Sequence, residues 1–91
     1  MAGIQKYGYI FKAPGFHNDR RTMDSGSFRA EIAAVGRIED ACGVARELVS
    51  EGVELIELCG SFGEKGAAMV SEAVAGVVPV AFVSREIPGK G

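Results

Sequence analysis

Two side chains with reactive chemistry, Glu57 and Cys59, lie two residues apart near the end of one predicted strand. Residues at this spacing face the same side of a strand, so we expect the carboxylate and the thiol side by side. A carboxylate in an apolar strand is costly to bury unless it is paired or protonated, which makes Glu57 a candidate acid or base. The alternative is a structural salt bridge to Lys12 or Arg21. Cys59 directly precedes a predicted helix, whose positive end favours a nucleophilic thiolate; the alternative is a small buried apolar residue.

A glycine-rich turn follows the thiol and leads into the predicted helix. Glycines here let backbone N–H groups approach a ligand, and the positive end of the helix dipole favours an anion. The turn matches neither common nucleotide-binding glycine motif, and Glu64 opposes bound negative charge. A tight strand-to-helix turn without a ligand is therefore the alternative. The residues expected to contact an anion are Gly60, Ser61, Phe62 and Gly63.

A polar segment, residues 14–27, contains the histidine of the chain, His17, and the neighbouring pair Arg20 and Arg21. If the segment lies at the same sheet edge as the thiol, His17 could be the third catalytic residue. The two arginines and Gly15 could then hold an anionic substrate. The alternative is an exposed loop histidine without a role. The spacing of the three candidate catalytic residues does not support a metal site, and no cofactor is indicated.

Hydrophobic periodicity predicts the elements that position these residues. Alternating or continuous apolar runs predict four strands, and an i, i+3, i+4 pattern predicts the two main helices. The polar segment predicts a short helix within residues 18–25, with Asn18 or Asp19 as its N-cap and Gly26 beyond its end. The strands are expected at Lys6–Ala13, Phe28–Val35, Val53–Cys59 and Val77–Ser84, and the helices from Ile38 to a stop at Gly52 and at Glu64–Ala75, before a frayed tail at Arg85–Gly91.

The alternation of strands and helices predicts an α/β domain with a small, open, mainly parallel four-stranded sheet. The second strand carries Arg29 and Glu31 on one face, which favours a sheet edge and the strand order 2-1-3-4. In that order the carboxyl ends of strands one and three meet at the point where ligands gather in open α/β sheets. A partial (β/α) barrel is the alternative. An antiparallel hairpin of strands one and two would separate the polar segment from the thiol.

Length and composition indicate a single domain over residues 1–91, with 47% hydrophobic residues and a formal net charge of −2. That charge argues against nucleic acid or an anionic membrane as a partner. The longest uncharged stretch is too short to span a bilayer, and no secretion signal is expected at the start. Two cysteines form no disulfide framework, so the expected location is the cytoplasm.

The first predicted strand carries an aromatic row, Tyr7, Tyr9 and Phe11, on one face. Two main helices are too few to cover both faces of a four-stranded sheet, so this face is expected to pack against another copy of the chain. The alternative is that the short helix of residues 18–25 covers it. We therefore expect a homo-oligomer.

Two stretches of the chain resemble a family of small prokaryotic proteins known as a domain of unknown function: Tyr9-Ile10-Phe11-Lys12-Ala13-Pro14-Gly15 and Leu55-Ile56-Glu57-Leu58-Cys59-Gly60-Ser61-Phe62-Gly63. The resemblance runs over essentially the whole chain and implies a compact α/β domain without an assigned activity. The second stretch is also similar to strand ends of (β/α) aldolase-type barrels. The catalytic lysine of those enzymes has no counterpart here unless Lys12 is counted.

The resulting hypothesis is a small cytoplasmic protein that binds a small anionic metabolite at the carboxyl ends of strands one and three. Any chemistry would be acid/base or thiol chemistry by Glu57, Cys59 and His17. The alternative is a non-catalytic oligomeric module with an interaction or regulatory role. The sequence leaves open whether the protein is an enzyme.

Overall fold

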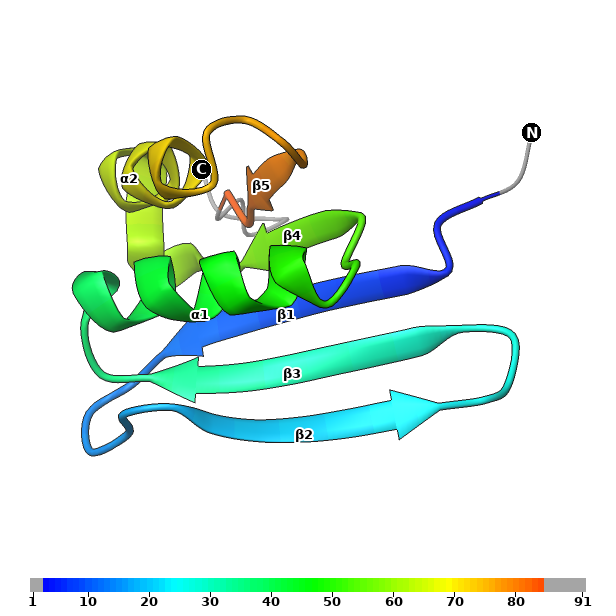
Figure 1. The fold of residues 1–91 in the computed structure, drawn as a ribbon. Helices are drawn as coiled ribbons and strands as arrows, with labels where there is room; N and C mark the ends of the chain where they lie inside the picture. Colours follow the sequence, from blue (N-terminus) through cyan, green and yellow to red (C-terminus); the bar gives the residue numbers. More distant parts are fainter. Residues whose placement is uncertain (1–2, 85–91) are drawn as a thin grey trace, which may run out of the picture.

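The computed structural model describes residues 3–84 and arranges them in a layer of strands and a layer of helices (Figure 1). The strands are β1 (Lys6–Lys12), β2 (Asp19–Asp24), β3 (Arg29–Val35), β4 (Leu55–Leu58) and β5 (Val80–Phe82). The helices are α1 (Ile38–Ser50) and α2 (Gly63–Ala73), and a 3-10 turn, η1 (Gly60–Phe62), leads into α2. The predicted α/β class is confirmed.

The sheet is open and mostly parallel, in the order β2-β3-β1-β4-β5. Every neighbouring pair is parallel except β2 with β3. The predicted strand count is wrong, because the sheet has five strands, and the full order differs because β2 lies outside β3. The four predicted strands, β3, β1, β4 and β5, keep the relative order 2-1-3-4. β1 pairs with β3 in parallel, with Tyr9 opposite Ile32, so these two strands do not form the antiparallel hairpin considered above. The sheet also does not curl into the partial barrel.

Helix α1 packs its apolar stripe directly onto the centre of the sheet. Leu48 and Ala45 are fully buried there, against a core that includes Ile10 and Ile56. The close approach depends on Gly8, since a Cβ at this position would lie 2.9 Å from Leu48 Cδ1. The 3.6-residue period of the sequence therefore predicted this helix and its buried face correctly.

The predicted short helix within residues 18–25 is wrong, because this segment forms β2 and pairs antiparallel with β3. A tight turn joins the two strands, in which Asp24 Oδ1 accepts a hydrogen bond from the Gly26 N–H at 2.8 Å. Ser25 Oγ accepts another from the Phe28 N–H at 3.1 Å. Gly26 thus serves a hairpin turn and ends no helix. Short polar side chains that bond their own backbone are typical of such turns.

The expectation that strand two lies at a sheet edge is also wrong, because β3 lies between β2 and β1. Its acidic residue Glu31 is only 4% exposed. The carboxylate accepts hydrogen bonds from Arg20 Nη2 at 2.8 Å, Thr22 Oγ1 at 2.8 Å and Arg29 Nε at 3.0 Å. Burial by itself would raise the pKa of Glu31. The hydrogen bonds from the three donors have the larger combined effect, so the pKa lies below its usual value. An interior strand can therefore carry this charge, because β2 supplies its partners.

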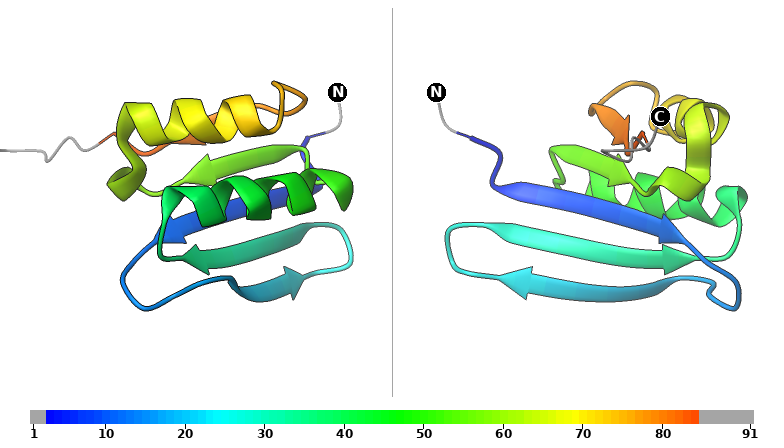
Figure 2. Two further views of the ribbon diagram at one scale, coloured as in Figure 1. Left: turned by 60° about the vertical axis from the view of Figure 1, so that its left-hand side comes forward. Right: turned by 180° about the vertical axis from the view of Figure 1, so that it is seen from behind.

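Both helices lie on the same face of the sheet, which leaves the opposite face open (Figure 1). Seen from behind in Figure 2, β1, β3 and β2 lie in front with no helix over them. Tyr7, Tyr9 and Phe11 of β1 point to this open face, because their neighbours Gly8 and Ile10 face α1. The open face is the surface on which the predicted aromatic row lies.

The later elements are shorter than expected. β4 and β5 together cover seven residues, four and three, and α2 ends two residues before the predicted Ala75. The predicted frayed tail, residues 85–91, lies outside the described residues. Among residues 3–84, no helix is both long and apolar enough to cross a membrane.

Candidate functional site

The thiol of Cys59 lies just past the end of β4, held by groups from two segments. Its Sγ accepts a hydrogen bond from the Lys12 backbone N–H at 3.4 Å and lies 2.7 Å from Ser61 Oγ. The Ser61 hydroxyl also lies 3.2 Å from the Lys12 carbonyl oxygen, so it joins the turn to the end of β1. Partial burial works to raise the pKa of Cys59, but hydrogen bonds from Ser61 and Lys12 outweigh it, and the pKa is lowered.

The turn after the thiol has few free backbone donors for a separate anion. The Phe62 N–H donates to the Cys59 carbonyl at 3.2 Å, and the Gly63 N–H donates to the Gly60 carbonyl. The Cys59 sulfur itself bonds the Lys12 N–H and the Ser61 hydroxyl. Phe62 is only 5% exposed, with its ring in the core, so its side chain is not available to a ligand. The Ser61 hydroxyl, which was expected to contact an anion, thus contacts the Cys59 sulfur.

Glu57 faces the open side of the sheet, two residues before the thiol. Its Oε1 accepts a hydrogen bond from the Tyr7 hydroxyl at 2.5 Å instead of pairing with Lys12 or Arg21. Partial burial, followed by this bond and by the carboxylate charge, raises the pKa of Tyr7. Burial also raises the pKa of Tyr9, with smaller contributions from the charges of Cys59 and Glu57. Tyr7, Tyr9 and Glu57 therefore form one cluster on the open face, and Cys59, past the end of β4, packs against the core.

The two arginines of the predicted ligand site point to opposite faces of the sheet, as neighbours in a strand must. Arg20 faces α1, where its guanidinium bonds both Glu31 and the Glu51 carboxylate, the latter at 2.6 and 3.0 Å. Arg21 lies on the open face and pairs with Asp19 at 2.6 Å. The structure therefore does not bring the two side chains together as a clamp.

The predicted third catalytic residue, His17, lies beside α1. With Asn18 it lines a shallow pocket of about 230 Å³ whose other wall includes Glu39, Asp40 and Glu47. The course of this loop is fixed at Gly36, where a Cβ would lie 2.4 Å from the Phe16 carbonyl oxygen. Gly15, in the same loop, has a φ of +91° that suits glycine.

The structure thus places Glu57 in β4 and Cys59 just past its end, each with its own hydrogen-bond partners, and places His17 beside α1. Within residues 3–84, no three side chains of His, Cys, Asp or Glu lie close enough together to hold a metal ion.

Periodicity did not identify Tyr7 as the partner of Glu57, although it predicted Tyr7 in the aromatic row. The bond depends on the register of β1 against β4, which pairs Tyr9 with Glu57 and Tyr7 with Leu55. Glu57 and Tyr7 are then diagonal neighbours on one face, within reach of a tyrosine side chain. Register is a property of paired strands, so the periodicity of each strand alone carried no signal for this contact.

Comparison with known proteins assigns the chain to a family. A family model described as "Family of unknown function (DUF6506)" matches residues 5–88, which confirms the resemblance found in the sequence. No curated protein and no solved structure matches the chain. Since the matched region covers nearly all of the chain, the protein belongs to the DUF6506 family of unknown function.

Proposed function

We propose that this protein works as a homodimeric module in which two copies pack their open sheet faces together. The observation that carries the proposal is the one-sided helix layer over a sheet whose other face is aromatic. Within residues 3–84 no element covers that face (Figure 2). Phe28 and Met23, at its outer end, are 42% and 67% exposed. Apolar faces of this kind typically mark an interaction surface.

The size of the face fits a small dimer interface. The strands have 7, 6, 7, 4 and 3 residues. At about 3.3 Å per residue and about 4.8 Å between strands they give a flat area of roughly 430 Å², and projecting side chains add to it. A standard protein interface removes about 800 Å² per partner. The face also has two hollows, of about 310 and 160 Å³, that side chains of a second copy could fill.

Aromatic contacts already organise this surface within one copy. Tyr7 and Phe28 have ring centroids 6.2 Å apart, and Phe11 meets Phe16 edge-on at 5.8 Å. Rings held by such contacts lose little freedom when a partner covers them. Glu57 can be covered as well, because the Tyr7 hydroxyl already bonds its carboxylate.

Sedimentation velocity over a range of protein concentrations tests the proposal. We expect the native chain to reach a mass of about twice 9.5 kDa, and Tyr9→Glu to stay at 9.5 kDa because it introduces a charge into the centre of the face. The matched control is Met69→Glu on α2, since Met69 is an exposed apolar residue of the helix layer (46%). A monomeric native chain, or loss of the dimer in the control alone, would contradict the proposal.

A second candidate function is binding of a small anionic metabolite, with thiol chemistry, at the carboxyl ends of β1 and β4. Its support is the lowered pKa of Cys59 beside Ser61, together with the carboxylate of Glu57 two residues earlier in β4. A thermal-shift screen with phosphorylated and carboxylated metabolites tests it. A ligand at 100 times its Kd should add about 2.7 kcal/mol of stability. Stabilisation that survives Cys59→Ala would place the ligand elsewhere.

We also propose a reducing compartment, the cytoplasm, as the location. Both cysteines of the chain, Cys42 and Cys59, are free thiols in the structure. A low-pKa thiol is sensitive to oxidation, which a reducing compartment limits. Detection of the native protein in an oxidising compartment would refute this location.

A further inference from the structure

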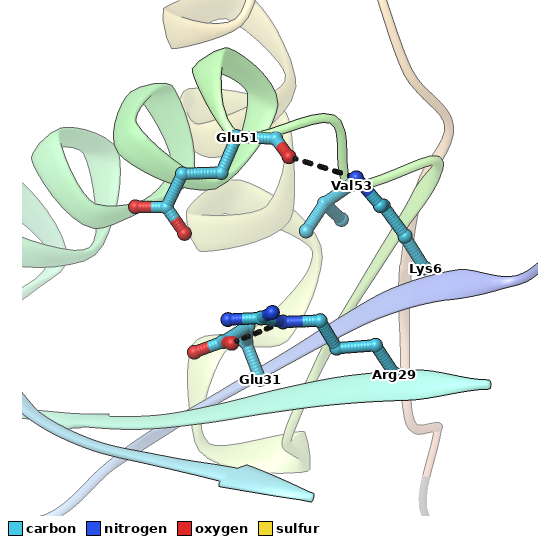
Figure 3. Close-up of a pocket in the computed structure, with 5 residues that line it drawn as sticks. All are labelled: Lys6, Arg29, Glu31, Glu51 and Val53. Atoms are coloured by element: carbon cyan, nitrogen blue, oxygen red, sulfur yellow. Dashed lines mark hydrogen bonds and ion pairs between the residues drawn. The ribbon is translucent and has the colours of Figure 1, made fainter. Parts of the chain in front are cut away.

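A second surface feature, unrelated to the open face, is a polar pocket of about 300 Å³ on the helix side of the sheet. It lies between the carboxyl end of α1 and the amino ends of β1 and β3, and its lining residues are Lys6, Arg29, Glu31, Glu51 and Val53 (Figure 3). This volume is at the lower end of the range for small-molecule sites. The pocket is at the opposite end of the strands from Cys59.

The acceptors in the pocket wall are already engaged. Glu31 Oε1 accepts from Arg20, and Oε2 accepts from both Thr22 and Arg29. Both carboxylate oxygens of Glu51 accept from the guanidinium of Arg20. These bonds use three of the roughly four lone-pair sites of Glu31 and two of those of Glu51, so most of the acceptor capacity of the wall is taken within the chain.

The donors in the same wall have capacity to spare. Lys6 Nζ has three N–H bonds, and its contact is a long one of 3.5 Å to the Glu51 carbonyl oxygen. Arg29 is held through Nε by Glu31, and its terminal Nη groups form no hydrogen bond to the described part of the chain. In Figure 3 the Arg29 side chain extends across Glu31 and Lys6 reaches towards Glu51, so both cations border the pocket.

We propose that this pocket binds a small monocarboxylate through Lys6 and Arg29. The unbonded N–H groups of Lys6 and Arg29 suit an acceptor ligand, and a planar carboxylate matches the two Nη groups of an arginine. The side chain of Val53 offers apolar contact to a short alkyl body. The volume corresponds to about ten water molecules, which sets the upper size of the ligand.

The charge balance of the pocket favours one negative charge over two. Three cationic side chains, Lys6, Arg20 and Arg29, face three carboxylates, Glu31, Glu47 and Glu51. A fourth carboxylate, Glu54, accepts from the Lys6 backbone N–H and interacts with the Lys6 charge. A phosphate dianion would add twice the repulsion from these carboxylates. The carboxyl end of α1 is nearby as well, and the negative end of a helix dipole disfavours a highly charged anion.

Titration of the ¹⁵N-labelled full chain with butyrate, followed by NMR at constant ionic strength, tests the proposal. We expect saturable shifts at the Lys6 and Val53 amides and at Arg29 Nε–H. Butyramide, which lacks the charge, should give none, and inorganic phosphate should bind more weakly than butyrate. Lys6→Gln should weaken butyrate binding at least tenfold, whereas Lys65→Gln on α2, also an exposed lysine, should leave it unchanged.

Each other outcome overturns the proposal. If butyrate gives no saturable shifts, the site does not exist. If butyramide binds as well as butyrate, the contact is purely apolar. If phosphate binds as well as butyrate or better, the pocket is a general anion contact. Because Arg29 also pairs with Glu31, Arg29→Lys serves as a second variant that keeps the charge but loses the planar geometry; unchanged binding there would remove the arginine from the site. These NMR readouts do not depend on whether two copies pair through the open face, so the two proposals can fail separately.

Discussion

The ion pair between Arg20 and Glu31 is expected to be a major source of stability, and Arg20→Met removes it while keeping the apolar stem of the side chain. Glu31 is 4% exposed and would lose one of its three hydrogen-bonding partners. A hydrogen bond to a charged group contributes about 1.5 to 3 kcal/mol. The bonds of Arg20 to the exposed Glu51 add at most about 1 kcal/mol.

We therefore expect Arg20→Met to lower the free energy of unfolding by about 2 to 3 kcal/mol. This is less than the roughly 3 to 5 kcal/mol of a buried pair that loses its whole partner, because Thr22 and Arg29 still bond Glu31. For a domain of this size, a loss of about 2 kcal/mol corresponds to a Tm lower by roughly 8 to 16 °C.

Urea unfolding followed by circular dichroism measures this loss at a fixed protein concentration. Arg46→Met, at an exposed position of α1, is the matched control and should change stability by less than about 0.5 kcal/mol. Adding Glu31→Gln to Arg20→Met should recover part of the loss, since it removes the buried charge that lacks its main partner. Equal stability of the Arg20 and Arg46 variants would refute the reasoning.

The same pair predicts a pH dependence with a definite sign. The pKa of Glu31 is lowered in the native state, so its contribution is present at neutral pH and is lost as the pH falls below the ordinary glutamate value of about 4.3 and through the native pKa. The stability difference between the native chain and Arg20→Met should therefore shrink as the pH is lowered from 7 towards 3. A difference that stays constant over this range would show that the charge of Glu31 is not its source.

Three further predictions concern single sites. Cys59 should react with iodoacetamide near neutral pH faster than a free cysteine. Ser61→Ala should slow this reaction, because loss of the hydroxyl raises the pKa of Cys59; an unchanged rate would contradict the role of the hydroxyl. Gly8→Val should destabilise the chain by at least about 1 kcal/mol through overpacking against Leu48, as measured by thermal unfolding; a neutral effect would show that α1 can shift away. Tyr7 should ionise only well above the usual tyrosine range in an ultraviolet pH titration, and Glu57→Gln should move its pKa back towards the ordinary value; unchanged titration would exclude the contact.

The elements predicted best from the sequence are those whose signal is local. Ile38, Ala41 and Leu48 follow the helical period, and α1 is found where that pattern predicts it. β2 could not be found in this way, because Arg20 and Thr22 give no apolar alternation. Its strand conformation depends on pairing with β3, and the hydrogen bonds to Glu31 become visible only once the two strands are aligned.

The candidate site also divides into residues placed by local sequence signals and residues placed by long-range contacts. The apolar run of the sequence predicts the strand that holds Glu57, and Cys59 lies just past its end. The position of His17 depends on how the loop after β1 packs against Gly36, a contact between distant backbone segments. Sequence spacing carries no information on such a contact, so the composite site of all three residues stays a prediction.

The central claim is that two copies meet through the open sheet face. Isotope-filtered NMR on a mixture of labelled and unlabelled protein tests it most directly, because it detects contacts between copies residue by residue. We predict intermolecular contacts to the ring protons of Tyr7, Tyr9 and Phe11. Intermolecular contacts confined to α1 and α2, or none at a concentration where the native chain is a dimer, would contradict the account.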